Sequence, residues 1–155
     1  MNVLTDLLEE GTIKIELEAR KKNDALRELV ELLHRAGKIG DLEAALNGLI
    51  DREKLTSTGI GSGIAIPHLL TQDVDETVMA FGRKREGLRF DAVDSQPVTL
   101  IVLIVGPKHH EFAHLRLLSR LSRLLHDEPF RQALLDAETP EQILQIFHRE
   151  EDKEG

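Results

Sequence analysis

Two runs of apolar residues in the first third of the chain repeat at intervals of three and four, which is the spacing of one helix face. The first run consists of Leu26, Leu29, Val30 and Leu33, and the second of Leu42, Ala45, Leu46, Leu49 and Ile50. They predict two consecutive amphipathic helices, each with one buried face. Asp41 immediately precedes the second run and is expected to cap that helix.

Other segments have the patterns of strands. Residues 12–17 alternate apolar and charged side chains, which predicts a half-exposed strand, and short apolar runs at 64–66 and 77–83 also indicate strands. Residues 98–105 form the most apolar run and are rich in β-branched side chains. This run predicts a central strand that is buried on both faces.

The last third of the chain is predicted to be helical. Leucines within residues 111–126 give a broad apolar face, and a shorter helix is expected to begin near Pro129. Thr139 has the pattern of an N-terminal cap for a last helix that runs through Phe147. Residues 150–155 are mostly charged and are expected to form a frayed tail.

The alternation of these patterns predicts one α/β domain, a single mixed β-sheet flanked by helices on both sides. The chain has 155 residues, which is enough for one domain with a hydrophobic core and argues against a second domain. We therefore expect a domain over residues 1–149, followed by the tail at 150–155.

A glycine-rich loop precedes a proline and a histidine in the middle of the chain. Gly59, Gly61 and Gly63 stand at every second position, so the backbone can adopt positive φ values and turn amide groups toward an anion. A proline cannot donate to a sheet, so Pro67 is expected to end the short strand and leave His68 at its carboxyl end. Open α/β sheets usually bind their ligands there.

A histidine beside apolar residues is more often a structural group than a reactive one. Near neutral pH, however, much of the imidazole is uncharged and a good nucleophile. Phosphoryl transfer through it needs a neutral ring nitrogen, a neighbour that fixes the tautomer, and N–H or cationic groups around the oxygens. His68 and the glycine loop together could meet these needs.

The chain resembles the enzyme IIA domains of the fructose/mannitol class of the bacterial phosphoenolpyruvate-dependent sugar phosphotransferase system, including their nitrogen-regulatory branch. The resemblance covers nearly the whole chain, and its most specific part is the segment that ends in Pro67-His68. It is carried by Arg52-Glu53, Thr58-Gly59-Ile60-Gly61, Ile64-Ala65-Ile66-Pro67-His68, Gly87-Leu88-Arg89-Phe90-Asp91-Ala92-Val93-Asp94-Ser95-Gln96-Pro97-Val98, and Ala113-His114-Leu115 with Leu117-Leu118.

The resemblance implies that His68 accepts and passes on the phosphoryl group, with Nε2 as the attacking atom. It implies that Arg52 steadies the phosphoryl oxygens and that His114 is the second active-site histidine. Further contacts to the phosphoryl group are expected from the loop residues Ser57, Thr58, Gly59 and Gly61. The hydroxyl residues of this loop can also cap its amide groups, and the sequence leaves both roles open.

One residue departs from the family pattern. Relatives usually have glycine, alanine or cysteine after this histidine, whereas this chain has Leu69. Leu69 and Leu70 are expected to form an apolar rim at which a partner protein docks, and the larger Leu69 would narrow the approach.

Composition narrows the classes of function. A formal charge of −8, from 28 acidic and 20 basic residues, argues against general nucleic-acid binding. The chain has no cysteine, so disulfides and thiolate metal sites are excluded. It has neither a signal-peptide pattern nor an apolar run long enough to span a membrane, so we expect a soluble, cytoplasmic protein. Arg83, Lys84, Arg85 and Arg89 form one basic cluster, interpreted as a solvated surface rather than a dock for an acidic partner.

A rival motif lies at residues 110–114. His110 and His114 flank Glu111 in an H-E-x-x-H pattern, which in metalloproteases places two zinc ligands one helical turn apart. The motif follows Gly106-Pro107 closely, so His110 falls at or before the helix start, and no third ligand is marked. A zinc hydrolase is thus a remote alternative, and we assign no metal.

We expect a phosphocarrier that receives its phosphoryl group from a phosphorylated histidine carrier protein and needs no cofactor. In the nitrogen-type branch, phosphorylation would change which regulatory target proteins it binds. In the transport branch, the group would pass to a IIB domain for fructose/mannitol-type uptake. The sequence shows no fused IIB domain or membrane segment, which favours the regulatory branch. A binding module that is no longer phosphorylated is a third possibility.

Overall fold

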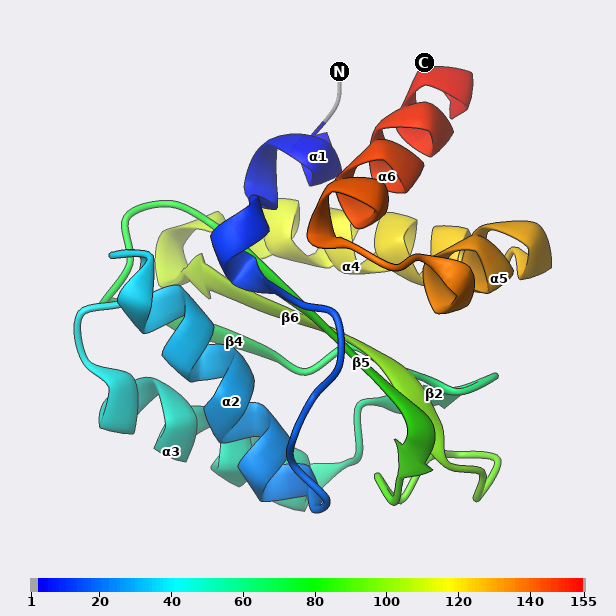
Figure 1. Cartoon of the computed structure of the whole chain (residues 1–155). Coiled ribbons are helices and arrows are strands. Elements are labelled where there is room, and N and C mark those ends of the chain that lie inside the picture. The colour runs from blue at the N-terminus through cyan, green and yellow to red at the C-terminus, as the bar shows by residue number, and fades with distance from the viewer. Residues whose placement is uncertain (1–2, 155) are drawn as a thin grey trace.

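A computed structural model describes residues 3–154, in which one mixed sheet lies between two layers of helices (Figure 1). The strands are β1 (Ile13–Lys14), β2 (Gly59–Gly61), β3 (Ile64–Ala65), β4 (His68–Thr71), β5 (Val78–Leu88) and β6 (Val98–Pro107). The α-helices are α1 (Val3–Leu7), α2 (Lys22–Arg35), α3 (Leu42–Leu55), α4 (Glu111–Leu125), α5 (Glu128–Asp136) and α6 (Pro140–Glu154), and 3-10 turns lie at Glu10–Thr12 and Lys108–His110.

The sheet has the order β1-β5-β6-β3-β2, and β4 also pairs with β6. β5 and β6 are antiparallel, whereas β1 runs parallel to β5, and β3 and β4 run parallel to β6. The predicted fold class, a mixed sheet with helices on both sides, is therefore confirmed. None of the helices within residues 3–154 is long and apolar enough to cross a membrane.

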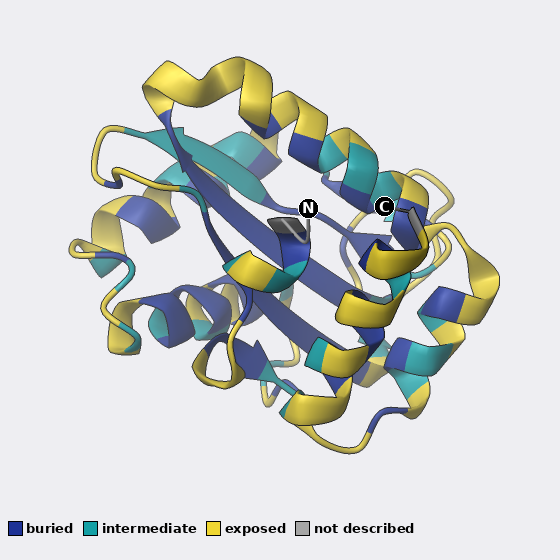
Figure 2. Ribbon diagram, turned by 90° about the horizontal axis from the view of Figure 1, so that it is seen from above, coloured by how far each residue is buried: buried dark blue, intermediate teal, exposed yellow. Residues whose placement is uncertain are grey.

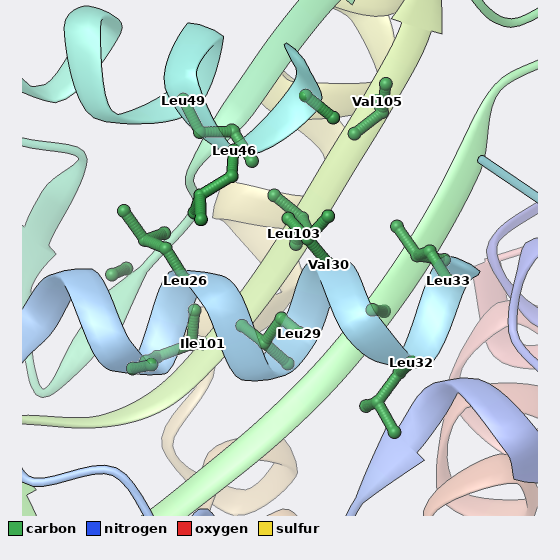
Figure 3. Packing of buried hydrophobic residues seen from close by; sticks show 14 of the residues in the cluster. Leu26, Leu29, Val30, Leu32, Leu33, Leu46, Leu49, Ile101, Leu103 and Val105 are labelled. Carbon is green, nitrogen blue, oxygen red and sulfur yellow. The ribbon is translucent and has the colours of Figure 1, made fainter. Parts of the chain in front are cut away.

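β6 is the predicted central strand, and all its side chains are buried except the half-buried Thr99. Because successive side chains of a strand point to opposite faces, β6 contributes to two separate cores. Ile101, Leu103 and Val105 pack with the apolar faces of α2 and α3 (Figure 3), whereas Leu100, Val102 and Ile104 pack with α1, α4, α5 and α6.

The helices turn their buried faces to the sheet and their exposed faces outward (Figure 2). α2 and α3 have the predicted apolar stripes, and Asp41 caps α3 by accepting a hydrogen bond from the Ala44 amide at 3.1 Å. At the start of α6, Thr139 accepts from the Gln142 amide at 3.2 Å, as its sequence pattern predicted.

Pro67 interrupts a strand instead of ending it. β3 pairs Ile64 with Leu100, and β4 pairs His68 with Ile104, so both segments follow β6 in one register. The carbonyl of Pro67 accepts from the Ile104 amide at 3.0 Å, which keeps the chain on β6 between them. The expectation that His68 stands at the carboxyl end of a strand is wrong, since His68 begins β4.

The predicted strand over residues 12–17 is also shorter than expected. Only Ile13 and Lys14 pair with β5. Beyond them the chain crosses over β5, where the Leu17 side chain packs against Gly82; a Cβ at position 82 would lie 2.9 Å from it. The alternating pattern therefore reflects a two-residue strand that begins with the buried Ile13, followed by a second buried apolar residue, Leu17, rather than a full strand.

The basic cluster is not a surface patch, because two of its members are buried. The Arg83 guanidinium donates to the carbonyls of Leu134, Leu135 and Ala137 at 2.6 to 3.0 Å, and so satisfies the C-terminus of α5. The Lys84 ammonium donates to the Leu17 carbonyl at 3.1 Å. The interpretation of these two residues as solvated charges is wrong.

The charged tail is helical where the structure describes it. α6 continues to Glu154, and the Glu151 side chain is buried. Its carboxylate accepts from the Leu4 amide and from the amide and hydroxyl of Thr5, and pairs with Arg120 at 3.2 Å. The expectation of a frayed tail is therefore wrong for residues 150–154, and Gly155 lies outside the described residues.

We predict that Arg83→Met lowers the free energy of unfolding by about 3 kcal/mol, because it leaves buried helix-end carbonyls without a donor. Arg85→Met is the matched control, since the exposed Arg85 side chain makes one longer hydrogen bond, to the Leu135 carbonyl at 3.3 Å. It should change stability by about 0.5 kcal/mol or less. Urea unfolding of both variants measures this, and equal losses would contradict the capping role of Arg83.

Candidate functional site

The orientation of the His68 ring is fixed by a backbone carbonyl two residues earlier in the chain. Its Nδ1 lies 2.8 Å from the carbonyl oxygen of Ile66. A carbonyl can only accept, so Nδ1 must carry the proton and Nε2 is left with a free electron pair. The half-buried ring lies on the face of the sheet that α4 covers, because Ile64, Ile66 and His68 share one side of the strand.

Its surroundings keep the His68 ring neutral. Burial lowers the pKa of His68 below its ordinary value of 6.5, and the positive charge of Arg52 acts in the same direction. The bond to Ile66 and the charge of Glu53 oppose this change without reversing it. A neutral imidazole with a fixed tautomer is the nucleophilic form.

The second histidine of the site, His114, lies beside the His68 ring. It lies in the first turn of α4 and is 3% exposed, with its ring centroid 5.6 Å from that of His68. Neither of its ring nitrogens has a hydrogen-bond partner within the described part of the chain. Burial lowers the pKa of His114 to about 4, and His68 contributes to this, so the ring is neutral at pH 7.

A position without a side chain makes room for His114. A Cβ at Gly106, in β6, would lie 3.0 Å from Nδ1 of His114 and 3.3 Å from the Thr77 hydroxyl. Any larger residue would push the ring away. The unsatisfied nitrogens and the close packing together indicate a ring that is held ready for a polar ligand rather than one that serves the core.

The site opens into a cavity of about 330 Å³ at the edge of the sheet. Arg52 reaches it from the last turn of α3, and His68 from β4. The cavity is lined by Arg52, Ser57, Thr58, Ile60, Ile66, His68, Leu118, Ser119 and Ser122. The structure therefore brings the predicted arginine, loop hydroxyl residues and histidine together in one place.

Three amide groups of the glycine loop are already engaged within the protein. The Thr58 amide donates to the Glu53 carboxylate, the Gly59 amide to the Ser57 hydroxyl at 3.0 Å, and the Ser62 amide to Asp94 at 3.1 Å. Neither Gly59 nor Gly61 lines the cavity. Both glycines belong to β2, where they pair with Ala65 and Ile64, and their contact to a phosphoryl group stays a prediction.

The hydroxyls of this loop are also engaged. Ser57 donates to the Phe90 carbonyl at 2.5 Å, and Thr58 donates to Glu53. Of the two roles left open by the sequence, Ser57 fills the capping role, since its hydroxyl also accepts from the Gly59 amide, whereas the Thr58 hydroxyl caps no amide and binds the Glu53 carboxylate. Glycine is required at position 59 because a Cβ there would lie 2.7 Å from Ala92.

Leu69 does not form the rim of the site. Its side chain points to the opposite side of β4 from His68 and packs over Gly48 of α3, where a Cβ would lie 2.9 Å from it. The larger residue after the histidine is thus accommodated by a glycine in α3. Leu70 shares the His68 face by alternation and is half-buried, so its predicted docking role is unaffected.

The H-E-x-x-H residues do not form a metal site. His110 is exposed at the end of a 3-10 turn, with non-helical φ and ψ of −112° and 36°, whereas His114 is buried against His68. Within residues 3–154, no group of three histidine, cysteine, aspartate or glutamate side chains is placed to hold a metal ion. His110 and His114 therefore do not have the relative placement that a zinc site requires.

The sequence analysis did not predict that residues of α4 beyond His114 line the cavity. Leu118, Ser119 and Ser122 line the cavity one and two turns beyond His114. Their helical spacing from His114 was a usable signal, since residues three and four apart share a face. Only the packing of α4 against the sheet edge could show which flank faces His68.

Similarity to known proteins agrees with this geometry. Residues 6–150 match the family model "Phosphoenolpyruvate-dependent sugar phosphotransferase system, EIIA 2". The chain is 40% identical over 94% of its length to the fructose-specific EIIABC component of Bacillus subtilis strain 168, spanning 23% of that protein. It is 39% identical over 87% of its length to the fructose-specific EIIA component of Haloferax volcanii, covering 88% of it.

A solved structure extends the similarity to the fold. The nitrogen regulatory protein IIA-Ntr of Neisseria meningitidis superposes with a TM-score of 0.88 at 32% identity, covering 94% of this chain and 99% of that one. A phosphotransferase component is thus the class that fold and site define. The chain belongs to the EIIA 2 family of the phosphoenolpyruvate-dependent sugar phosphotransferase system, whose members here include both fructose-specific and nitrogen regulatory proteins.

We predict that the buried histidine makes the fold sensitive to acid. The folded pKa of His114, about 4, lies below its ordinary value of 6.5, so the unfolded chain takes up the proton first. This stability is complete above the unfolded pKa and is lost as pH falls toward the folded pKa. Between pH 7 and pH 5, His114 should account for a loss of about 2 kcal/mol.

Urea unfolding at both pH values measures this loss, and His68 adds to it with the same sign. His114→Gln has a side chain that does not titrate, so its stability should fall less over the same interval. His126→Gln, which changes an exposed histidine, is the control and should behave as the unmodified chain. A wild-type stability that is flat from pH 7 to pH 5 would contradict the buried neutral ring.

Proposed function

We propose that His68 is the phosphoryl acceptor of this EIIA 2 protein and that its Nε2 forms the phosphohistidine. The observation that supports this most is the bond from Nδ1 to the Ile66 carbonyl at 2.8 Å, which leaves Nε2 as the nucleophilic nitrogen beside the cavity. The donor would be a phosphorylated histidine carrier protein, and the receiver a IIB domain or a regulatory target.

In the proposed step, the electron pair of Nε2 attacks the phosphorus in line with the bond to the donor nitrogen. A bond from Nε2 to phosphorus forms as the donor bond breaks, and its electron pair returns to the donor imidazole. The proton on Nδ1 stays where it is, held by Ile66. The step therefore needs no metal and no external base.

Arg52 and His114 would share the charge that spreads over the phosphoryl oxygens. Arg52 lines the cavity and bonds only weakly to the Thr56 carbonyl at 3.4 Å, so its guanidinium can turn to an anion. His114 is neutral, and among residues 3–154 its nitrogens have no hydrogen-bond partner, so its N–H can donate to an oxygen. Both interactions strengthen as negative charge arrives, which favours transfer over binding alone.

The first test is phosphorylation with phosphoenolpyruvate, enzyme I and a histidine carrier, read by intact mass and acid lability. We expect one acid-labile phosphoryl group, absent in His68→Ala. Arg52→Ala and His114→Gln should slow the reaction by on the order of a hundredfold, as for removal of a donor that stabilises transition-state charge.

The matched control is His126→Ala. His126 makes the same Nδ1 contact to a backbone carbonyl, that of Ser122 at 2.8 Å, but is exposed and does not line the cavity. Phosphorylation of His126→Ala should equal that of the wild type. A phosphoryl group that persists in His68→Ala would overturn the assignment, and loss of it in His110→Ala would revive the role of the H-E-x-x-H residues.

We further propose that the chain acts as a nitrogen-type regulatory component, supported by its close superposition on the Neisseria regulatory protein. Sugar transport is the second candidate, because relatives at 40% and 39% identity are fructose-specific. Incubating the phosphorylated protein with fructose and mannitol IIB domains separates the two. Complete transfer to one IIB domain within seconds would establish transport, whereas a stable phosphoprotein would favour regulation.

A further inference from the structure

We propose that Glu53 is a positioning residue for His68: its buried carboxylate fixes the backbone that orients the histidine ring. The inference rests on the proposed role of His68 and extends the machinery to a residue that does not line the cavity. Glu53 follows Arg52 in the last turn of α3, so adjacent residues serve the phosphoryl group and the nucleophile.

The Glu53 carboxylate is fully engaged. Its side chain is 4% exposed, and Lys22 Nζ lies 2.7 Å from Oε2. The Thr58 amide lies 3.3 Å from Oε1 and 3.1 Å from Oε2, and the Thr58 hydroxyl donates to Oε1. A buried carboxylate with donors on both oxygens holds its partners tightly, because losing any of them would leave a charge uncompensated.

A line of hydrogen bonds runs from this carboxylate to the histidine ring. Thr58 donates to Glu53 through its amide, and its carbonyl accepts from the Ile66 amide at 3.0 Å. The Ile66 carbonyl in turn accepts from His68 Nδ1 at 2.8 Å. A shift of Thr58 would therefore move the acceptor that selects the tautomer of His68.

The same ion pair also fixes the far side of the loop. Lys22 Nζ lies 4.6 Å from the centre of the Phe90 ring and 3.4 Å from the Phe90 carbonyl, which also accepts from Ser57. Lys22 and Glu53 thus join α2, α3, the loop at residues 57–59 and the chain near Phe90. These contacts hold Ser57 and Thr58, which line the cavity. An ion pair that served stability alone would not need to lie beside the site.

The deciding experiment is Glu53→Gln in the full chain, with two readouts. Glutamine keeps the size but removes the charge, and its amide nitrogen would face a donor. Nitrogen-15 NMR of the His68 ring should change from the single Nδ1–H tautomer toward a mixture. Phosphorylation by phosphoramidate, a small donor that needs no protein docking, should slow by about tenfold or more, as expected for a displaced reacting group.

Two controls separate positioning from stability. Glu43→Gln makes the same change on the same helix, at an exposed carboxylate 2.8 Å from Arg27, and should alter neither readout. Lys84→Met removes a different buried charge, one that donates to Leu17. Compared at equal fractions of folded protein, it should leave the His68 tautomer and the phosphoramidate rate unchanged.

A milder variant keeps the test decisive if Glu53→Gln does not fold. Thr58→Val removes one donor to the carboxylate and should shift the His68 tautomer in the same direction, with Glu43→Gln again as the control. An unchanged tautomer and rate in Glu53→Gln, or in Thr58→Val where the former is unfolded, would overturn the proposal. Equal losses in Lys84→Met would also overturn it.

The two proposals fail in different ways. If the wild type takes no phosphoryl group from phosphoramidate or from a carrier, the acceptor role of His68 is wrong. The NMR readout still tests Glu53 in that case, because the tautomer is a property of the unmodified ring. If the wild type is phosphorylated and Glu53→Gln behaves identically, only the positioning role is lost.

Discussion

The site depends on one hydrogen bond, from Nδ1 of His68 to the carbonyl of Ile66. This bond decides which ring nitrogen has a free electron pair, and it exists only because both residues lie on one segment that follows β6 across Pro67. β6 is buried along nearly its whole length, so the segment is aligned by a strand that packs on both of its faces. The reactive group therefore inherits its orientation from the sheet.

His114 shows the cost of such a site. A buried imidazole without partners is unfavourable in the free protein, since a polar group loses its water without replacement. Core packing offsets this cost, and Gly106 gives the ring its place. Because the His114 ring lies beside that of His68, with 5.6 Å between the ring centroids, a phosphoryl group on His68 could accept a hydrogen bond that His114 does not make in the free protein. The free protein is thus less stable than it could be, in favour of the modified one.

The sequence predicted those features that depend on local spacing. The apolar stripes of α2 and α3, the doubly buried β6 and the cap at Asp41 follow from periodicity and side-chain chemistry alone. The prediction of a phosphoryl-transfer site rested on the family resemblance, which is most specific at residues 64–68. The structure brings His68 and Arg52 to one cavity and places His114 beside His68, a grouping that no periodicity contained.

What the sequence could not predict depends on distant partners. The sequence suggested that the amides of Thr58 and Ser62 could bind a ligand, but in the fold they donate to the carboxylates of Glu53 and Asp94. Arg83 looked like a surface charge because α5, whose end it caps, lies far along the chain. Pro67 looked like a strand end because sequence alone does not show that β6 holds both of its neighbours. In each case long-range packing overrode the local pattern.

The contact between Leu69 and Gly48 links two positions that are distant in sequence. A glycine inside a helix costs about 1 kcal/mol relative to alanine, and the space beside Gly48 in α3 is filled by the Leu69 side chain. A relative with a small residue after the histidine leaves this space open and is free to carry a larger side chain in α3. The two positions should therefore vary as a pair among family members, with a larger side chain in α3 accompanying a smaller one after the histidine.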